Sequence, residues 1–279
     1  MKLKVINNAD DFGYSNSVNY GIIDAHRDGV LTSTTIMANM PGFDHAVKIA
    51  KEYPCLGIGV HCTLTCGRPL LNSHKTLVNS SGYFHTLSNY KKDSFRVDSN
   101  EVYAEFKSQI EMVILSGIEP THLDSHHHIH HYKDNMKIII QLAKEYNLPV
   151  RNSNTEELKK QGTKVKYVLE TAKIGSTVFE DNKIKCNDVL IGPYIRRENK
   201  IKNSKDLEQA IVDEIIESLE ESKGLNVVEV MWHPAYMDKS IMESSSLNIS
   251  RIYELQALLN EDLRKYLSIH CNLCTFREI

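Results

Sequence analysis

The chain has 279 residues, of which 41% are hydrophobic and 25% are charged, as in an ordinary globular protein. Its formal net charge of -3 offers no electrostatic support for binding to nucleic acid or an anionic membrane, and we expect neither partner. No apolar run approaches the roughly 20 residues of a membrane span, and the N-terminal segment enters a polar motif where a signal peptide would have its apolar core. We therefore expect a cytoplasmic protein.

The pattern of apolar residues predicts strands that alternate with helices along the chain. The predicted strands cover residues 2–8, 30–37, 56–64, 121–125, 150–152, 227–232 and 273–276. The predicted helices cover residues 17–28, 43–52, 100–116, 133–146, 205–222 and 251–267. Residues 72–98 and 155–204 are polar and weakly periodic, so we expect long loops there.

Helices of this length between strands indicate βαβ units, which build parallel sheets. The pattern therefore predicts an α/β fold of one domain over residues 1–279. The expected architecture is an irregular (β/α) barrel with mostly parallel strands and long loops over the C-terminal face. A doubly wound open sheet is the alternative.

The densest polar motif is THLDSHHHIHH at residues 121–131, which holds six of the thirteen histidines and one aspartate. Imidazole is the commonest metal ligand and titrates near neutral pH, so the motif indicates a metal site or a proton-transfer site. A histidine tract that collects metals adventitiously is the alternative. Strand alternation would place His126, His128 and His130 on one face, and His127 and His131 on the other.

Further side chains of acid, base or ligand type follow other predicted strands. Asp10 and Asp11 follow the first strand, His61 lies in the third, and His233 follows the strand 227–232. Each alone also fits a plain structural role, such as a turn, a helix cap or a buried core histidine. Because the carboxyl ends of parallel strands meet at one edge of a sheet, we expect these residues to converge with the histidine motif.

One carboxylate and two imidazoles leave coordination positions on a metal open for water and a substrate oxygen, as a hydrolytic site requires. A second carboxylate can take a proton from the water, and an imidazole can protonate the leaving group. Asp10 and Asp11 suit the two carboxylate roles, His233 suits the acid, and Asp124 could orient a ligand histidine. An iron oxygenase with two histidines and one carboxylate has the same ligand count. A hydrolase of another amide or a phosphoester, and a non-catalytic metal-binding protein, are further alternatives.

The six cysteines do not indicate a disulfide framework. Cys271 and Cys274 form a C-x2-C pair, but no second ligand pair accompanies it at the spacing of a structural zinc site. We expect buried or half-buried free thiols rather than a structural zinc site or disulfides.

Four segments resemble the YdjC-like carbohydrate deacetylases, a family that includes chitooligosaccharide (diacetylchitobiose) deacetylases. They are NADDFG at residues 8–13, GVHCTLT at 59–65, the motif at 121–130, and MWHPAY at 231–236. The resemblance implies an irregular α/β barrel that uses one divalent metal, Mg²⁺ by family, to hydrolyse N-acetyl groups of short amino-sugar oligosaccharides. It also suggests a homodimer. Mixed aspartate and histidine ligation leans instead toward a transition metal such as Zn²⁺.

The resemblance also implies roles for individual residues. Asp11, His61 and His126 match the metal ligands of the family. Asp10 matches the base, and His233 matches a candidate acid. His128 and Arg151 are candidates for contacts with the substrate or the transition state. The chain departs from the family pattern at Cys62, where a large apolar residue is common, and at His131-Tyr132, which replaces a proline-containing turn.

Overall fold

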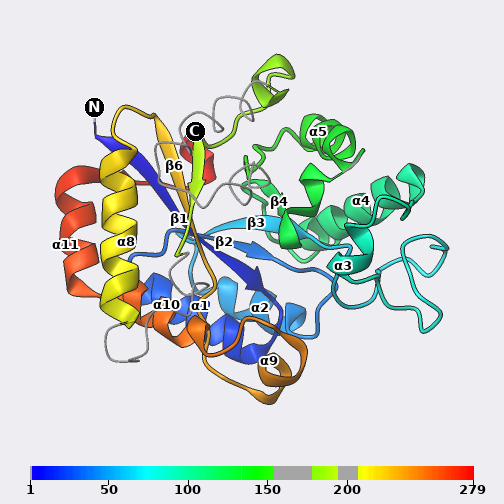
Figure 1. The fold of residues 1–279 in the computed structure, drawn as a ribbon, viewed down its shortest axis with the longest axis horizontal. Coiled ribbons are helices and arrows are strands. Elements are labelled where there is room, and N and C mark those ends of the chain that lie inside the picture. The colour runs from blue at the N-terminus through cyan, green and yellow to red at the C-terminus, as the bar shows by residue number, and fades with distance from the viewer. Residues whose placement is uncertain (1, 133, 154–177, 194–206) are drawn as a thin grey trace.

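The computed structural model describes residues 2–132, 134–153, 178–193 and 207–279. Its centre is a parallel sheet that curls into a half-barrel, with the strand order β4-β3-β2-β1-β6-β5 (Figure 1). The expected α/β class and irregular barrel with parallel strands are confirmed. The strands are β1 (Leu3–Phe12), β2 (Ser33–Ile36), β3 (Gly57–Cys62), β4 (Leu123–Ser125), β5 (Val189–Ile191), β6 (Val227–Trp232) and β7 (Cys271–Leu273).

The longest strand, β1, organises the sheet. It pairs with β6 through residues 4–9, with β2 through residues 8–12, and with β7 through residues 3–5. All of these pairings are parallel, so β1 carries its residues 8–12 to the same edge as the carboxyl ends of β2, β3, β4 and β6. This edge is where the predicted site residues lie.

Helices pack on the outer side of the curl (Figure 1). Contacts join α8 to α10 and α11, α4 to α5, and α1 to α2 and α10. The helices are α1 (Asn16–Arg27), α2 (Phe43–Ala50), α3 (Leu87–Tyr90), α4 (Ser99–Leu115), α5 (Asn135–Tyr146), α8 (Leu207–Glu221), α9 (Lys239–Ser244), α10 (Ser250–Leu259) and α11 (Glu261–His270). Two 3-10 turns, η1 (His126–His131) and η4 (Phe276–Glu278), complete the described elements.

Strand alternation gives the sheet two chemically different faces. Val5 and Ala9 of β1 belong to the large core, which also contains the buried residues of the helices. The opposite face has a separate apolar cluster at the amino ends of the strands, formed by Ile6, Val227, Cys274 and Phe276. Beyond this cluster, toward the carboxyl ends, the same face becomes polar and carries Asn8, Asp10 and Glu229.

Several predicted boundaries are wrong. The helix predicted at 251–267 is two helices, because Asn260 is extended (φ -70°, ψ 133°) and its side chain caps α11. The strand predicted at 273–276 lies earlier, as β7, and is followed by η4. The segment 150–152 forms only an isolated bridge between Leu123 and Val150.

The two long loops also contain structure that the sequence pattern did not predict. Strand β5 lies within 155–204, and α3 and a bridge between Val78 and Phe84 lie within 72–98. Residues 155–177 and 194–204 of the expected loop, and the first residues of the helices predicted at 133–146 and 205–222, lie outside the described residues. The long connection between β3 and α4, which includes the loop predicted at 72–98, begins at the carboxyl edge of the sheet. This agrees with the prediction of long loops over that face.

All six cysteines are free thiols, and five of them are buried or half-buried as predicted, whereas Cys55 is exposed. Among the described residues, no helix has the length and apolar character needed to cross a membrane.

Candidate metal centre

The site begins at an irregularity near the end of β1. Asp10 and Asp11 are neighbours in an extended strand, so regular alternation would send their side chains to opposite faces. However, the β1–β2 register shifts between Ala9 and Phe12, and Asp11 has a φ of 73°. The short polar side chain of aspartate tolerates this left-handed conformation better than most. Both carboxylates consequently approach His61 Nε2, at 3.9 Å for Asp10 and 3.6 Å for Asp11.

Three atoms of metal-ligand type lie close together in the site. They belong to Asp11 of β1, His61 of β3 and His126 of the turn after β4. Asp11 Oδ1 lies 3.6 Å from His61 Nε2 and 3.0 Å from His126 Nδ1. This oxygen is buried and accepts no hydrogen bond from the described residues. His61 Nδ1 lies 2.7 Å from Asp124 Oδ1, an acceptor for its N–H, which leaves Nε2 as the ring nitrogen that faces Asp11. One carboxylate oxygen and two imidazole nitrogens form a suitable donor set for a divalent cation.

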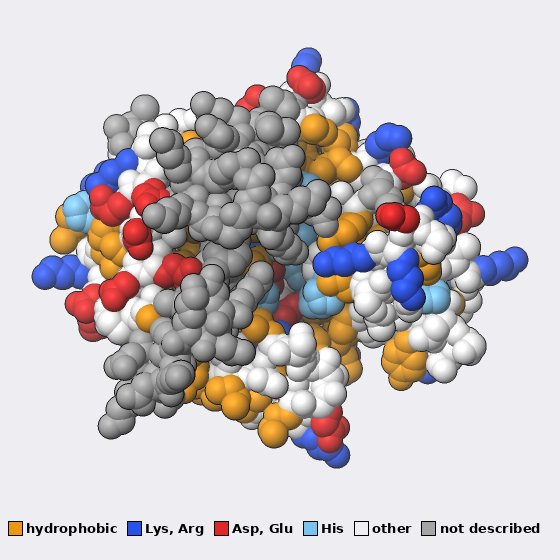
Figure 2. Space-filling model, viewed as in Figure 1, with side chains coloured by type: hydrophobic (Ala, Val, Ile, Leu, Met, Phe, Trp, Pro, Cys, Tyr) orange, Lys and Arg blue, Asp and Glu red, His pale blue; other side chains and the backbone are white. Residues whose placement is uncertain are grey.

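The charge balance around this group also favours a cation. Five buried carboxyl groups surround only two buried guanidinium groups, and the excess negative charge would be costly without a further positive partner. In Figure 2, histidine and acidic side chains gather in a hollow near the middle of the face shown. The buried charged residues around this group are Asp10, Asp11, Asp124, Glu229, Glu254, Arg151 and Arg251.

The pKa values report the same negative potential. Burial by itself would lower the pKa of His126, but the neighbouring Asp11 carboxylate has the opposite effect, and the pKa is raised to about 10. Burial also lowers the pKa of His61, yet Asp124 and Asp10 leave it raised. For Asp11, burial raises the pKa, but Arg251, His126 and His233 together outweigh this, so the pKa of the carboxyl lies well below its usual range. A position between these groups therefore stabilises positive charge.

Each aspartate is held by a different arginine. Asp11 Oδ2 accepts a hydrogen bond of 2.6 Å from Arg251 Nη2, which α10 supplies. Asp10 accepts two hydrogen bonds from Arg151, from Nη1 over 2.9 Å and from Nη2 over 2.7 Å. Burial raises the pKa of Asp10, but the Arg151 guanidinium reverses this and keeps the pKa well below its usual range.

A second group of metal-ligand type consists of Asp10, His61 and Asp124. The Arg151 guanidinium already lies between the two carboxylates of this second group. Arg151 Nη1 is 2.7 Å from Asp124 Oδ2 and also donates to Asp10. A guanidinium thus takes the place that a second cation would need. The described residues therefore favour one metal in this site rather than several.

His233 follows β6 and faces Asp10. Its Nε2 lies 3.9 Å from Asp10 Oδ2. On the other side, the carboxylate of Glu254 accepts a hydrogen bond from the His233 backbone N–H over 2.6 Å, and Glu254 Oε2 lies 3.8 Å from His233 Nδ1. The imidazole is mostly buried, with 15% of the side chain exposed. It thus lies between two carboxylates at the edge of the site.

The histidine motif does not continue the strand, so the alternation predicted for it is wrong. Strand β4 ends at Ser125, and residues 126–131 form a 3-10 turn in which His127 and His128 have φ values of 59° and 54°. His126 faces the metal group, whereas the exposed His127 places Nδ1 2.9 Å from Thr65 Oγ1. His128 is half-buried on the turn.

The remaining histidines of the motif hold the structure around the site. His130 Nε2 lies 3.1 Å from the carbonyl oxygen of Arg151, and His131 Nε2 accepts a hydrogen bond of 3.0 Å from the Ser153 backbone N–H. His122 stacks on Phe276 with 3.8 Å between ring centroids, in the space that the missing side chain of Gly59 leaves. These three imidazoles connect the turn, the segment after α5 and the C-terminal turn.

The structure thus brings Asp10, Asp11, His61, His126 and His233 together, as the sequence predicted. Arg151 also reaches the site, but it is completely buried against carboxylates, which favours a positioning role over substrate contact. Sequence reasoning missed three charged residues: Arg251 and Glu254, which lie in a helix, and Glu229, which lies in a strand. The only signal for Glu229 was a carboxylate within the otherwise apolar segment VVEVMW, and the helical pair had none.

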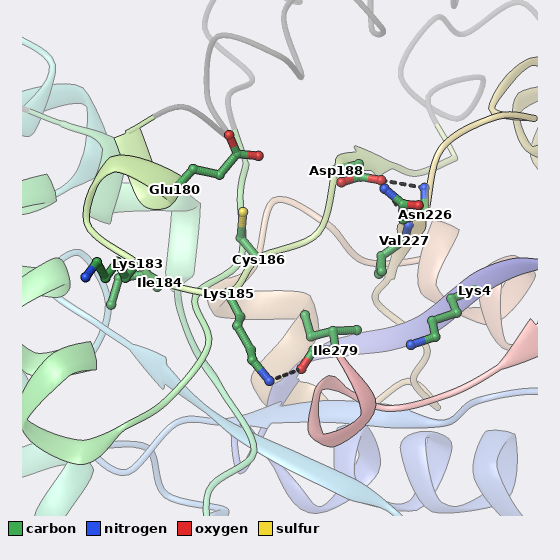
Figure 3. Close-up of a pocket in the computed structure, with 10 residues that line it drawn as sticks. All are labelled: Lys4, Glu180, Lys183, Ile184, Lys185, Cys186, Asp188, Asn226, Val227 and Ile279. Carbon is green, nitrogen blue, oxygen red and sulfur yellow. Dashed lines mark hydrogen bonds between the residues drawn. The ribbon is translucent and has the colours of Figure 1, made fainter.

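A pocket on another part of the molecule is separate from this site (Figure 3). Its lining includes Lys4 and Val227, which lie at the amino ends of β1 and β6, opposite to the carboxyl ends that carry the metal group. Lys185, which also lines it, donates to the main-chain oxygen of Ile279 over 2.7 Å.

Comparison with known proteins bears on this geometry. The sequence matches the YdjC-like protein family over residues 4–268. Proteins named carbohydrate deacetylase from Brevibacillus brevis and Clostridium beijerinckii are each 34% identical, over 281 and 278 residues; each match covers 99% of this chain and 100% of the relative. A crystal structure from Enterococcus faecalis V583, provisionally named a cellobiose-phosphate cleavage protein, is 30% identical, with a TM-score of 0.81 and coverage of 100% of this chain and 99% of its own. Agreement over almost the whole length shows that this chain belongs to the YdjC-like family.

Proposed function

We propose that this protein is a metal-dependent carbohydrate deacetylase that removes N-acetyl groups from short amino-sugar oligosaccharides of the chitobiose type and releases acetate. The observation that carries this proposal is the group of Asp11, His61 and His126 with a second carboxylate, Asp10, beside it. The relatives named carbohydrate deacetylase support the same activity.

Asp11, His61 and His126 would hold one divalent cation, for which the family resemblance points to Mg²⁺. Such a cation polarises the acetamide carbonyl and lowers the pKa of water at the site. Asp124 keeps His61 in the tautomer that presents Nε2, and Arg251 holds the second oxygen of Asp11. Both ligands therefore stay oriented while the substrate binds and leaves.

Asp10 would act as the general base. Because Arg151 holds its pKa well below the usual range, the carboxylate is ionised at neutral pH and can accept a proton from the attacking water. Arg151 also fixes both oxygens of Asp10, so the carboxylate does not rotate away.

His233 would protonate the departing amine of the sugar. Its imidazole lies between Asp10 and Glu254, with Nε2 3.9 Å from Asp10 Oδ2 and Nδ1 3.8 Å from Glu254 Oε2. His128, half-buried on the turn beside His126, is proposed to contact the substrate.

The name of the Enterococcus faecalis structure raises a second candidate, cleavage of a phosphorylated disaccharide. The same ligands could serve phosphoester hydrolysis, since a divalent metal polarises a phosphoryl oxygen as well as a carbonyl. Glycosidic cleavage would use a pair of carboxyl groups across the sugar bond.

Acetate release from diacetylchitobiose, measured with and without a chelator, tests the proposal. We expect release that stops on chelation and returns when a divalent metal is added. Cellobiose phosphate, assayed in parallel for phosphate and for monosaccharide, tests the second candidate. Product from cellobiose phosphate alone, or acetate release that a chelator leaves intact, would contradict the proposal.

A further inference from the structure

Arg151 is the most highly paired charge in the described interior. Its side chain is completely buried and contacts three carboxylates from three strands: Asp10 of β1, Asp124 of β4 and Glu229 of β6. Glu229 Oε1 accepts from Arg151 Nε over 2.8 Å and lies 2.6 Å from Nη2. The Glu229 carboxylate thus contacts the edge of the guanidinium that Nε and Nη2 form.

The other edge faces the groups that do chemistry in the proposed function. Nη1 and Nη2 both donate to Asp10, and Nη1 also lies 2.7 Å from Asp124, which in turn orients His61. A planar guanidinium transmits orientation, because its five N–H bonds point in fixed directions. Any rotation of the Arg151 plane would therefore move the base and loosen a metal ligand together.

We propose that Glu229 is a positioning residue, which holds the Arg151 guanidinium in the orientation that aligns Asp10 and Asp124. The proposal rests on the proposed function. The main chain of Arg151 is held separately, through the hydrogen bond between its carbonyl oxygen and His130. Glu229 is needed to orient the guanidinium at the end of the Arg151 side chain, because the main-chain hydrogen bond does not fix the orientation of that group.

Stability alone does not account for a carboxyl group at this position. Glu229 is fully buried, and its second oxygen, Oε2, accepts no hydrogen bond from the described residues. Burial raises the pKa of Glu229 to about 7, although Arg151 acts in the opposite direction. Two carboxylates already pair with the guanidinium, so an apolar residue of similar volume would be expected to stabilise the fold at least as well.

This contrast provides the experiment. Glu229→Met removes the acceptor at similar volume, and Glu229→Gln keeps an oxygen in reach of Arg151 Nε. Val228→Ala is the matched control, because Val228 lies in the same strand, is buried, and belongs to the core on the opposite face. For each variant, thermal unfolding, kcat and KM for acetate release, metal affinity and a crystal structure would be determined.

We expect Glu229→Met to fold with an unchanged or higher Tm, while kcat falls ~10²-fold because the base is misplaced. KM should remain near that of the natural protein, metal affinity should fall because Asp124 no longer orients His61, and Arg151 should be displaced in the crystal structure. Glu229→Gln should restore most of the lost kcat. Val228→Ala should lower Tm and leave kcat intact.

A Glu229→Met variant with natural kcat, or with an unmoved Arg151, would overturn the proposal. A kcat loss that simply follows Tm across all three variants would also overturn it, since that is a structural effect. If the natural protein releases no acetate, the proposed function fails, but the position of Arg151 in the variant crystal structures still tests the positioning role.

Discussion

Asp10 and Asp11 are adjacent in the chain, yet the fold assigns them to different partners. The bulge at the end of β1 turns both toward His61, and each then binds its own arginine, Asp10 to Arg151 and Asp11 to Arg251. The consequence is one carboxylate beside two imidazoles and a second carboxylate that stays ionised next to them. This division is the basis for a ligand and a base.

Two substitutions should separate these roles. Asp10→Asn is expected to keep the metal but lose about 10²–10⁴-fold in kcat, because the amide cannot accept the proton. His126→Ala should lose both the metal and turnover, since only His61 and Asp11 remain. Metal binding by calorimetry and acetate release check both results. His127→Ala, which removes the neighbouring imidazole that contacts Thr65, is the control and should retain the metal. An Asp10→Asn variant with near-normal turnover would remove Asp10 as the base.

At the residue scale, the sequence predicted those site residues whose type is unusual at the end of a strand. The paired aspartates and the histidines after strands are visible because ordinary strand ends do not need them. Glu254 and Arg251 are not visible, because charged residues in an amphipathic helix are normally exposed. Only packing of α10 against the site buries them.

At the scale of elements, the histidine motif illustrates how a turn changes the use of a sequence. A continued strand would have presented three histidines on one face, but the left-handed residues His127 and His128 reverse the chain instead. His126 alone then meets the metal group, and His130 and His131 fold back on the Arg151–Ser153 segment. Local residue types do not specify this reversal, because histidine adopts left-handed backbone more often than most residues but still uncommonly.

The junction of α10 and α11 provides a test of a local feature. The Asn260 side chain accepts hydrogen bonds from the N–H groups of Asp262 and Leu263, so it is the N-cap of α11. Asn260→Ala should lower the free energy of unfolding by about 1 kcal/mol, whereas Asn260→Ser should retain most of it. Urea unfolding measures both. Equal stability of the two variants would mean that the cap does not hold the junction.

At the scale of the whole molecule, the inner face of the half-barrel is layered. The apolar cluster around Phe276 closes the amino end, the buried layer of Arg151 and its carboxylates lies beyond it, and the metal group lies at the carboxyl edge. Each layer supports the next, because the apolar cluster excludes water and so strengthens the ion pairs above it. The layers come from strands far apart in sequence, which is why no local pattern displays them.

His122, at the boundary of the first two layers, makes stability depend on pH. Burial and the nearby Arg151 hold its pKa well below the ordinary value, so it stays neutral in the folded protein. The unfolded chain takes up this proton below about pH 6.5, so the free energy of unfolding falls as pH decreases, by about 1.4 kcal/mol per pH unit for one such histidine. His122→Gln should reduce that slope by about this amount between roughly pH 6 and pH 4. Urea unfolding of the metal-free protein across this range measures the slope, and an unchanged slope would contradict the assignment.

The sequence by itself determined the alternation of strands and helices, the parallel sheet and the edge at which Asp10, Asp11, His61, His126 and His233 meet. These follow from periodicity and from the geometry of parallel strands, which act over a few residues at a time. Only the tertiary structure decided that both aspartates face inward, that one histidine of the motif meets the metal group, and that Glu229, Arg251 and Glu254 are buried beside it. Those outcomes depend on a bulge, a reversed turn and the packing of distant elements, where the free energy comes from contacts that no local window of sequence contains.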